Sequence, residues 1–114
     1  MTEKQQKCDT LLVAVVQSQD AEITDNKLGP LVPTVTRLPS IGAFLGRRNA
    51  TLLIGLYQTV KAKVVDILHE NCRQRVEFIA VPLESAPMPL PAPTPITVGG
   101  ATIFSLEVEH FEEF

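Results

Sequence analysis

Cysteine is scarce in this sequence, and a metal-binding cluster is missing from it. The two cysteines, Cys8 and Cys72, are too few for a disulfide framework, and neither belongs to a cysteine–histidine cluster with zinc-finger spacing. We therefore expect both thiols to be reduced. His69 and His110 lack partners at metal-ligand spacing, so we interpret them as structural or surface residues and expect no metal site.

An excess of basic residues is also absent. The 114 residues include 10 lysines and arginines against 13 aspartates and glutamates, which gives a net charge of −3. Binding to DNA or RNA polymers requires a basic face, so we expect no nucleic-acid polymer as a partner. No apolar run reaches the length of a membrane span, and the start, MTEKQQK, lacks the apolar core of a signal peptide. The default expectation is a cytoplasmic protein.

No arrangement of side chains indicates catalysis. Glu107 and Glu109 flank a single strand residue and share a face, but no defined cleft accompanies them. We expect a protein that is not an enzyme, with no catalytic residue and no cofactor.

What the sequence does contain is an alternation of predicted strands and helices. Strands are predicted where apolar or β-branched residues run on or alternate, over residues 11–16, 32–38, 51–57, 76–81 and 101–108. The first of these is continuously apolar, which favours a strand covered on both faces or a central strand of a sheet over a half-exposed one. One helix is predicted through Ala21 and Leu28, to be ended by Gly29–Pro30, and a stronger one over Thr59–Cys72. The second and third strands should form an antiparallel pair.

The order of these elements predicts the fold. Strand, helix, strand, strand, helix, strand is the split β-α-β arrangement of a ferredoxin-like α+β sandwich. Residues 1–10 are expected to form a flexible tail and residues 11–114 a single domain. Six prolines between Pro82 and Pro95 predict a loop over 82–97. One face of the sheet would carry both helices, and the other would be covered by further copies of the chain.

The stretch Gly42–Leu56, GAFLGRRNATLLIGL, brings together a small-residue turn, a basic pair and an aromatic residue near a carboxamide. Small residues let backbone N–H groups approach a phosphate, and Asn49 can pair with the edge of an adenine. Phe44 and Phe104 offer surfaces on which purines stack. The pattern favours a pocket for a flat, anionic ligand.

Plainer interpretations stand beside this one. Phe44 and Phe104 could be core residues, Arg47 and Arg48 an ordinary solvated turn, and Asn49 a residue chosen for a left-handed turn.

Several stretches, spread over nearly the whole chain after residue 10, match a known pattern. They are VVQSQDA (15–21), TVTRL (34–38), GAFLGRRNATLLIGL (42–56), ENCRQR (70–75) and VGGATIFSLEVEHFEEF (98–114). In these stretches the chain resembles the PII-like signalling proteins of the cyclic-di-AMP receptor family. The resemblance implies a ferredoxin-like homotrimer with one cyclic-di-AMP site at each subunit interface. It also implies a non-enzymatic second-messenger receptor that signals to a target protein, which the sequence does not identify.

The resemblance also implies which residues bind the ligand. The positions that match the family's binding positions are Thr36, Phe44, Leu45, Asn49, Gly55 and Phe104. The predicted site further includes Thr34, Gly42, Ala43, Arg47 and Glu113.

Two of these positions differ from the family pattern and keep an alternative open. Thr34 stands where the family commonly has arginine, and a charge-assisted bond worth about 1.5–3 kcal/mol would be lost unless Arg47 or Arg48 replaces it. Glu113 stands where the family has glutamine, and a carboxylate repels phosphate. The alternative is a diverged PII-like trimer that binds another nucleotide or only a protein partner. A metal-linked trimer like the divalent-ion tolerance proteins is disfavoured by the missing Cys/His cluster.

Overall fold

The computed structural model of the chain describes residues 7–39, 48–82 and 91–114. Its helices and strands follow in the order β1 (Thr10–Gln17), α1 (Ser18–Leu28), β2 (Thr34–Pro39), β3 (Asn49–Leu56), η1 (Gln58–Val60), α2 (Lys61–Cys72), β4 (Arg75–Pro82), β5 (Pro91–Val98) and β6 (Ala101–Glu107). Within the described part, no helix is long and apolar enough to cross a membrane.

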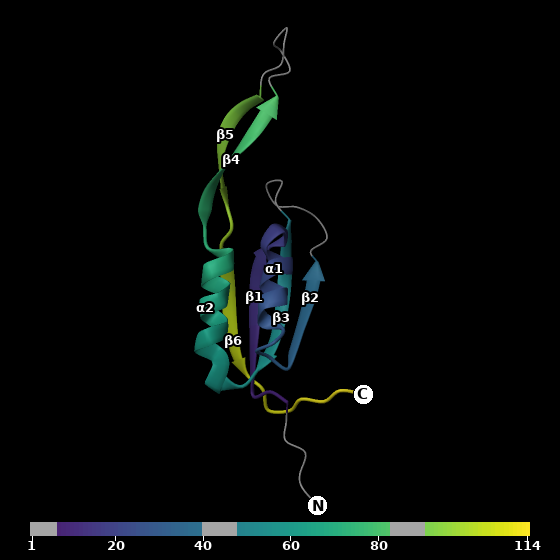
Figure 1. The fold of residues 1–114 in the computed structure, drawn as a ribbon. Coiled ribbons are helices and arrows are strands. Elements are labelled where there is room, and N and C mark those ends of the chain that lie inside the picture. Colours follow the sequence, from purple (N-terminus) through teal and green to yellow (C-terminus); the bar gives the residue numbers. More distant parts are fainter. Residues whose placement is uncertain (1–6, 40–47, 83–90) are drawn as a thin grey trace, which may run out of the picture.

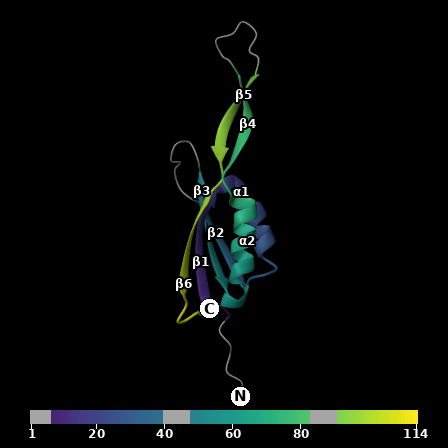
Figure 2. The same ribbon diagram turned by 90° about the vertical axis from the view of Figure 1, so that its left-hand side faces the viewer.

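Four strands form one antiparallel sheet in the order β2-β3-β1-β6. Both helices pack on the same face of this sheet, and no described element covers the other face (Figures 1 and 2). The predicted α+β class and the antiparallel pairing of β2 with β3 are confirmed. The arrangement is compatible with a ferredoxin-like fold.

The prediction was wrong about the strand that completes the sheet. The strand predicted over 76–81 exists as β4, but it pairs with β5 in a separate two-stranded hairpin that projects beyond the end of α2 (Figure 1). The fourth strand of the sheet is β6, which pairs with β1. Strand propensity alone does not say which partner a strand finds.

The prediction of a loop over 82–97 was also wrong from residue 91 onward, because residues 91–98 form β5. Pro91, Pro93 and Pro95 stand at alternate positions, and alternate residues of a strand direct their backbone groups to the same edge. All three missing N–H groups therefore fall on one edge of β5, and the intervening residues can pair with β4. Residues 83–90 of the predicted loop lie outside the described residues.

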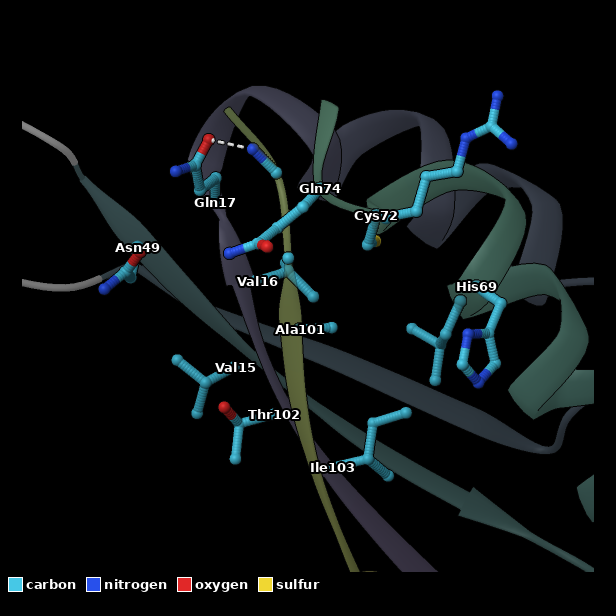
Figure 3. A pocket seen from close by; sticks show the side chains of 14 residues that line it. Val15, Val16, Gln17, Asn49, His69, Cys72, Gln74, Ala101, Thr102 and Ile103 are labelled. Atoms are coloured by element: carbon cyan, nitrogen blue, oxygen red, sulfur yellow. Dashed lines mark hydrogen bonds between the residues drawn. The ribbon is translucent and has the colours of Figure 1, made fainter. Parts of the chain in front are cut away.

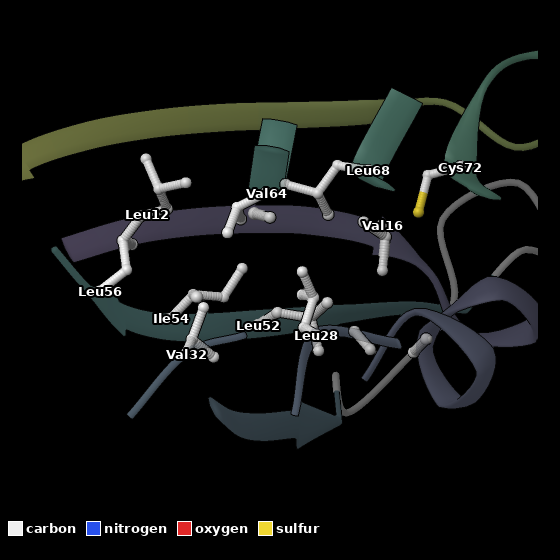
Figure 4. Close-up of a cluster of buried hydrophobic side chains, with 13 residues drawn as sticks. Leu12, Val16, Leu28, Val32, Leu52, Ile54, Leu56, Val64, Leu68 and Cys72 are labelled. Atoms are coloured by element: carbon white, nitrogen blue, oxygen red, sulfur yellow. The ribbon is translucent and has the colours of Figure 1, made fainter. Parts of the chain in front are cut away.

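The core lies between the sheet and the two helices. Its fully or nearly fully buried side chains come from alternate positions of β1 and β3 and from one side of each helix (Figure 4); among them are Leu12, Ala14, Val16, Ala50, Leu52, Ile54, Leu56, Leu28, Val64, Leu68 and Cys72. Burying one such leucine contributes about 1.5–3 kcal/mol. Cys72 is buried, with its Sγ 3.3 Å from Thr24 Oγ1, and burial raises the pKa of its thiol.

Strand β1 is an inner strand of the sheet, as one of its two predicted interpretations had it, and within the described part of one chain the helices cover only one of its faces. Its even-numbered residues are buried against the helices, whereas Leu11, Val13 and Val15 are only half-buried. The same open face of the sheet carries Phe104 and Leu106 of β6, which are 55% and 52% exposed. The sheet therefore presents an apolar surface, which we call the open face.

The predicted tail over residues 1–10 needs a correction at its end. Cys8 is only 2% exposed, and Thr10 begins β1. The N–H of Asp9 donates to the carbonyl of Leu56 at 3.1 Å, and the Asp9 carbonyl accepts from the N–H of Val108 at 2.9 Å. These bonds tie residues 8–10 to β3 and to the chain after β6. Residues 1–6 lie outside the described residues.

Candidate functional site

A cavity of about 540 Å³ lies at one end of the sheet, where β1 ends and where β3 and β6 begin (Figure 3). Residues after the end of α2 close another side of it. Val15, Val16 and Ile103 give it apolar surface, and Gln17, Asn49 and Gln74 give it carboxamides. The volume is in the range of small-molecule sites, which are mostly apolar and carry a few directed polar groups.

A turn of two glycines shapes this cavity. Gly99 and Gly100 have φ values of +83° and +101°, in the left-handed region that favours glycine. The N–H of Gly99 donates to Gln17 Oε1 at 2.7 Å, and the N–H of Gly100 donates to the carbonyl of Cys72. A Cβ on Gly99 would collide with the carbonyl oxygen of Arg73. The turn thus runs tightly against the end of α2 before the chain enters β6.

An ion pair anchors the base of the β4–β5 hairpin next to the cavity. Arg75 Nη2 donates to Asp20 Oδ1 at 2.7 Å, joining the first residue of β4 to the first turn of α1. A second bond runs from Arg75 Nε to Glu77 Oε1 at 3.0 Å. The hydrogen bond to Asp20 raises the pKa of Arg75, which keeps the guanidinium charged. The hairpin base is therefore held at two points, to α1 through Arg75 and to the end of β1 through Gly99.

The predicted binding residues lie at three levels of the sheet. Asn49 begins β3, is the register partner of Gln17 and lines the cavity. The predicted residues Gly42, Ala43, Phe44, Leu45 and Arg47, which precede it in the sequence, lie outside the described residues.

Thr36 and Phe104 lie in the middle of the sheet. Register aligns Thr36 with Leu53, Leu53 with Val13, and Val13 with Phe104, so one row crosses all four strands on the open face. Phe104 does not enter the core, so the plainer interpretation of it as a core residue is wrong.

Thr34, Gly55 and Glu113 lie toward the opposite end of the sheet from the cavity. Thr34 and Gly55 are register partners, and a Cβ built on Gly55 would lie 2.6 Å from Thr34 Cγ2. Glu113 forms an exposed ion pair with Lys7 at 3.1 Å, near the start of β1. Burial raises the pKa of the Cys8 thiol, and the charges of Asp9 and Glu113 add to that effect.

One chain does not bring all these residues together. Gly55 follows Asn49 by six residues of an extended strand, a separation of about 20 Å. A spherical cavity of this volume is only about 10 Å across. A single ligand in the cavity of one chain would reach Asn49 but not Thr34 or Gly55.

Sequence reasoning missed several residues of the cavity, namely Gln17, His69, Arg73, Gln74, Gly99 and Gly100. Each lies within or beside a stretch that carried the family resemblance, but spacing in the chain gave no reason to join them. They meet only because β6, rather than β4, pairs with β1. His69, interpreted as structural or surface, lines the cavity. In the described part of the chain no group of three or more His, Cys, Asp or Glu side chains could hold a metal ion.

The chain was compared with known protein families and with solved structures. The model of the cyclic-di-AMP receptor family matches residues 9–114. A crystal structure of a functionally unknown protein from Pediococcus pentosaceus is also similar, with 29% sequence identity and a TM-score of 0.70. That similarity covers 96% of this chain and 100% of the other. Because the family match spans nearly the whole chain, the cavity included, this protein belongs to the cyclic-di-AMP receptor family.

Proposed function

We propose that this chain is a non-enzymatic, PII-like receptor that binds cyclic-di-AMP between the subunits of a homotrimer and signals its presence to a target protein. The observation that carries the proposal is the family match over residues 9–114, which includes the carboxamide-lined cavity beside Asn49. The ligand offers two adenines and two phosphates, and the cavity offers amide groups and apolar surface of suitable size.

The separation of the predicted binding residues supports a site between subunits. Asn49 lies at the cavity end of β3, and Thr34 and Gly55 lie about 20 Å away toward the other end. A ligand that touches both groups must take them from different copies of the chain. The cavity end of one subunit would then meet the opposite end of its neighbour.

The open face of the sheet supports the homotrimer. Leu11, Val13, Phe104 and Leu106 form neighbouring pairs across β1 and β6 on that face. Monomeric proteins rarely leave a contiguous apolar surface of this kind in water, and large exposed patches usually mark contact with another protein. Three copies that pack these faces around a common axis would bury it.

Within such a site each predicted residue has a role. Asn49 pairs with an adenine edge, Phe104 stacks on a ring, and the Thr36 hydroxyl donates to the ligand. The backbone around Gly42–Leu45 approaches a phosphate, with Arg47 supplying positive charge. Thr34, Gly55 and Glu113 belong to the neighbouring subunit's contribution.

The β4–β5 hairpin is the element best placed to signal occupancy. It leaves the body of the molecule beside the cavity (Figure 1), and Phe78 and Val76 of β4 are 70% and 58% exposed. A ligand that contacts the Gly99 turn favours one position of the hairpin base, and a target protein that contacts the hairpin detects the shifted population.

Calorimetric titration tests the proposal directly. Cyclic-di-AMP should give saturable binding at one ligand per subunit, whereas ATP and AMP should bind weakly or not at all. A folded trimer that releases or absorbs no heat with cyclic-di-AMP would reject it.

The second candidate, a diverged trimer that binds another nucleotide or only a protein, is favoured by Thr34 and Glu113. In this case Thr34→Arg should create or strengthen binding of cyclic-di-AMP, because it adds a charge-assisted bond to phosphate. The same titration with the variant separates the two candidates, since unchanged binding removes the reason for the second.

A further inference from the structure

Three carboxamides meet on one side of the cavity although they come from distant parts of the chain. Gln17 ends β1, Asn49 begins β3, and Gln74 lies between α2 and β4. Figure 3 shows the three side chains on the side of the cavity away from His69. Only Asn49 belongs to the binding residues argued so far.

The orientation of the Gln17 amide is fixed by its partner. The backbone N–H of Gly99 can only donate, so the atom that faces it at 2.7 Å must be the amide oxygen of Gln17. The amide nitrogen and its two N–H groups therefore point the other way. Gln17 is almost fully buried, and the turn that holds Gly99 is tied to the end of α2 by the bond from the Gly100 N–H to the Cys72 carbonyl. Gln17 thus presents donors of fixed direction, with little rotamer freedom left to lose on binding.

Gln74 is positioned by the second glycine of the same turn. A Cβ on Gly100 would lie 3.2 Å from Gln74 Cγ, tighter than ordinary packing. The absence of a side chain at Gly100 leaves room for Gln74 to lie along the cavity wall. The glycine turn thus sets the place of one carboxamide and the direction of another.

These groups complement the edge of an adenine ring. The ring nitrogens accept hydrogen bonds and the exocyclic amino group donates them, so an adenine needs both donors and acceptors beside it. The amide oxygen of Gln17 already accepts from Gly99, so Gln17 offers the ligand only the donors on its amide nitrogen. Asn49 and Gln74 each offer both a carbonyl oxygen that accepts and an amide nitrogen that donates. Val15 and Ile103, which are half-buried, offer apolar surface to the ring.

We propose that Gln17, held by Gly99, is an adenine-binding residue that donates to a ring nitrogen of the base, with Asn49 and Gln74 completing recognition of its edge. This inference rests on the proposed function and names the part of the ligand that the cavity takes. It makes the glycine turn part of the binding site. The hydrogen bond from Gly99 to Gln17 then both orients the residue that binds adenine and holds the lower end of the β4–β5 hairpin.

The variant Gln17→Glu separates binding from structure. A carboxylate oxygen still accepts the Gly99 N–H, so the link to the turn is kept, but both N–H groups of the Gln17 amide are lost. Affinity for cyclic-di-AMP should fall about tenfold or more, as measured by calorimetric titration at low and at high salt. Gln58→Glu, which adds the same charge on the exposed surface of η1, is the matched control and should bind like the wild type. Circular dichroism checks that all three proteins are folded.

Each outcome decides a different question. If the wild type binds no cyclic-di-AMP, the proposed function fails and this inference fails with it. If the wild type binds and Gln17→Glu binds equally well, only the inference is overturned. If high salt restores binding to Gln17→Glu, the loss was repulsion between the new carboxylate and phosphate, and the inference is again overturned. A loss that persists at both salt concentrations supports it.

Discussion

At the scale of single residues, Gly99 is the position where the backbone tolerates least change. Its φ of +83° costs any other residue about 1–3 kcal/mol, and an added Cβ would also strike the Arg73 carbonyl. We predict that Gly99→Ala lowers the free energy of unfolding by at least that amount, measured by urea denaturation.

The matched control for this substitution is Gly29→Ala at the end of α1. Gly29 has right-handed helical backbone, and the nearest atom to a Cβ there would be 3.7 Å away. Such a change should be neutral or should stabilise by about 0.4–1 kcal/mol. Equal effects at the two glycines would show that backbone conformation is not what Gly99 supplies.

Single residues also show where sequence reasoning about the site stops. Asn49 could be proposed from its chemistry and its place after a basic turn, and it does line a cavity. Gln17 carries the same carboxamide, but its value depends on a glycine 82 positions away that fixes its direction. Such a contact depends on the topology of the fold and cannot be predicted from a local sequence pattern.

At the scale of elements, residue type predicted most strands and both helices because their apolar spacing follows simple periods. The hairpin is where this failed. Proline was taken to exclude a strand over 91–95, yet prolines at alternate positions of an edge strand leave the other edge able to pair. The number of prolines predicted a loop here, whereas their alternate spacing is compatible with a strand, and a strand is what forms.

The base of this hairpin depends on Arg75 and Asp20. The Asp20 side chain is 5% exposed and that of Arg75 is 31% exposed, so the pair lies between a surface and a buried ion pair. We predict that Arg75→Gln lowers the free energy of unfolding by roughly 1–3 kcal/mol, because it leaves the Asp20 carboxylate without its charged partner. Chemical denaturation measures the change.

Two further variants interpret that result. Arg37→Gln, at an exposed position of β2, removes the same charge and should cost less than about 0.5 kcal/mol. Adding Asp20→Asn to Arg75→Gln should recover part of the loss, since the buried charge is then gone. Strictly additive effects of the two substitutions would show that the pair contributes nothing as a pair.

At the scale of the whole molecule, the class and the order of elements as far as β4 could be predicted from the sequence, but β5 and the pairing of the last strand could not. The choice between β4 and β6 as the neighbour of β1 rests on contacts between segments far apart in the chain. The same choice creates the cavity, whereas the length of β3 separates Asn49 from Gly55 and so divides the predicted site between opposite ends of the sheet. The site is therefore a property of topology and, as we propose, of assembly.

The last prediction concerns the assembly of the subunits through the open face. Val13 lies at the centre of the open face, between Leu53 and Phe104 in the row that crosses the sheet. In a trimer that buries this face, Val13→Asp places an unpaired charge in an apolar contact, at a cost of several kcal/mol per subunit. Light scattering coupled to size-exclusion chromatography should show a trimer for the wild type and a folded monomer for the variant, with loss of cyclic-di-AMP binding. Phe78→Asp on the exposed hairpin should remain a trimer, because the hairpin lies outside the open face. A wild type that is monomeric, or a Val13→Asp protein that keeps the wild-type mass, would mean that the open face does not hold the subunits together.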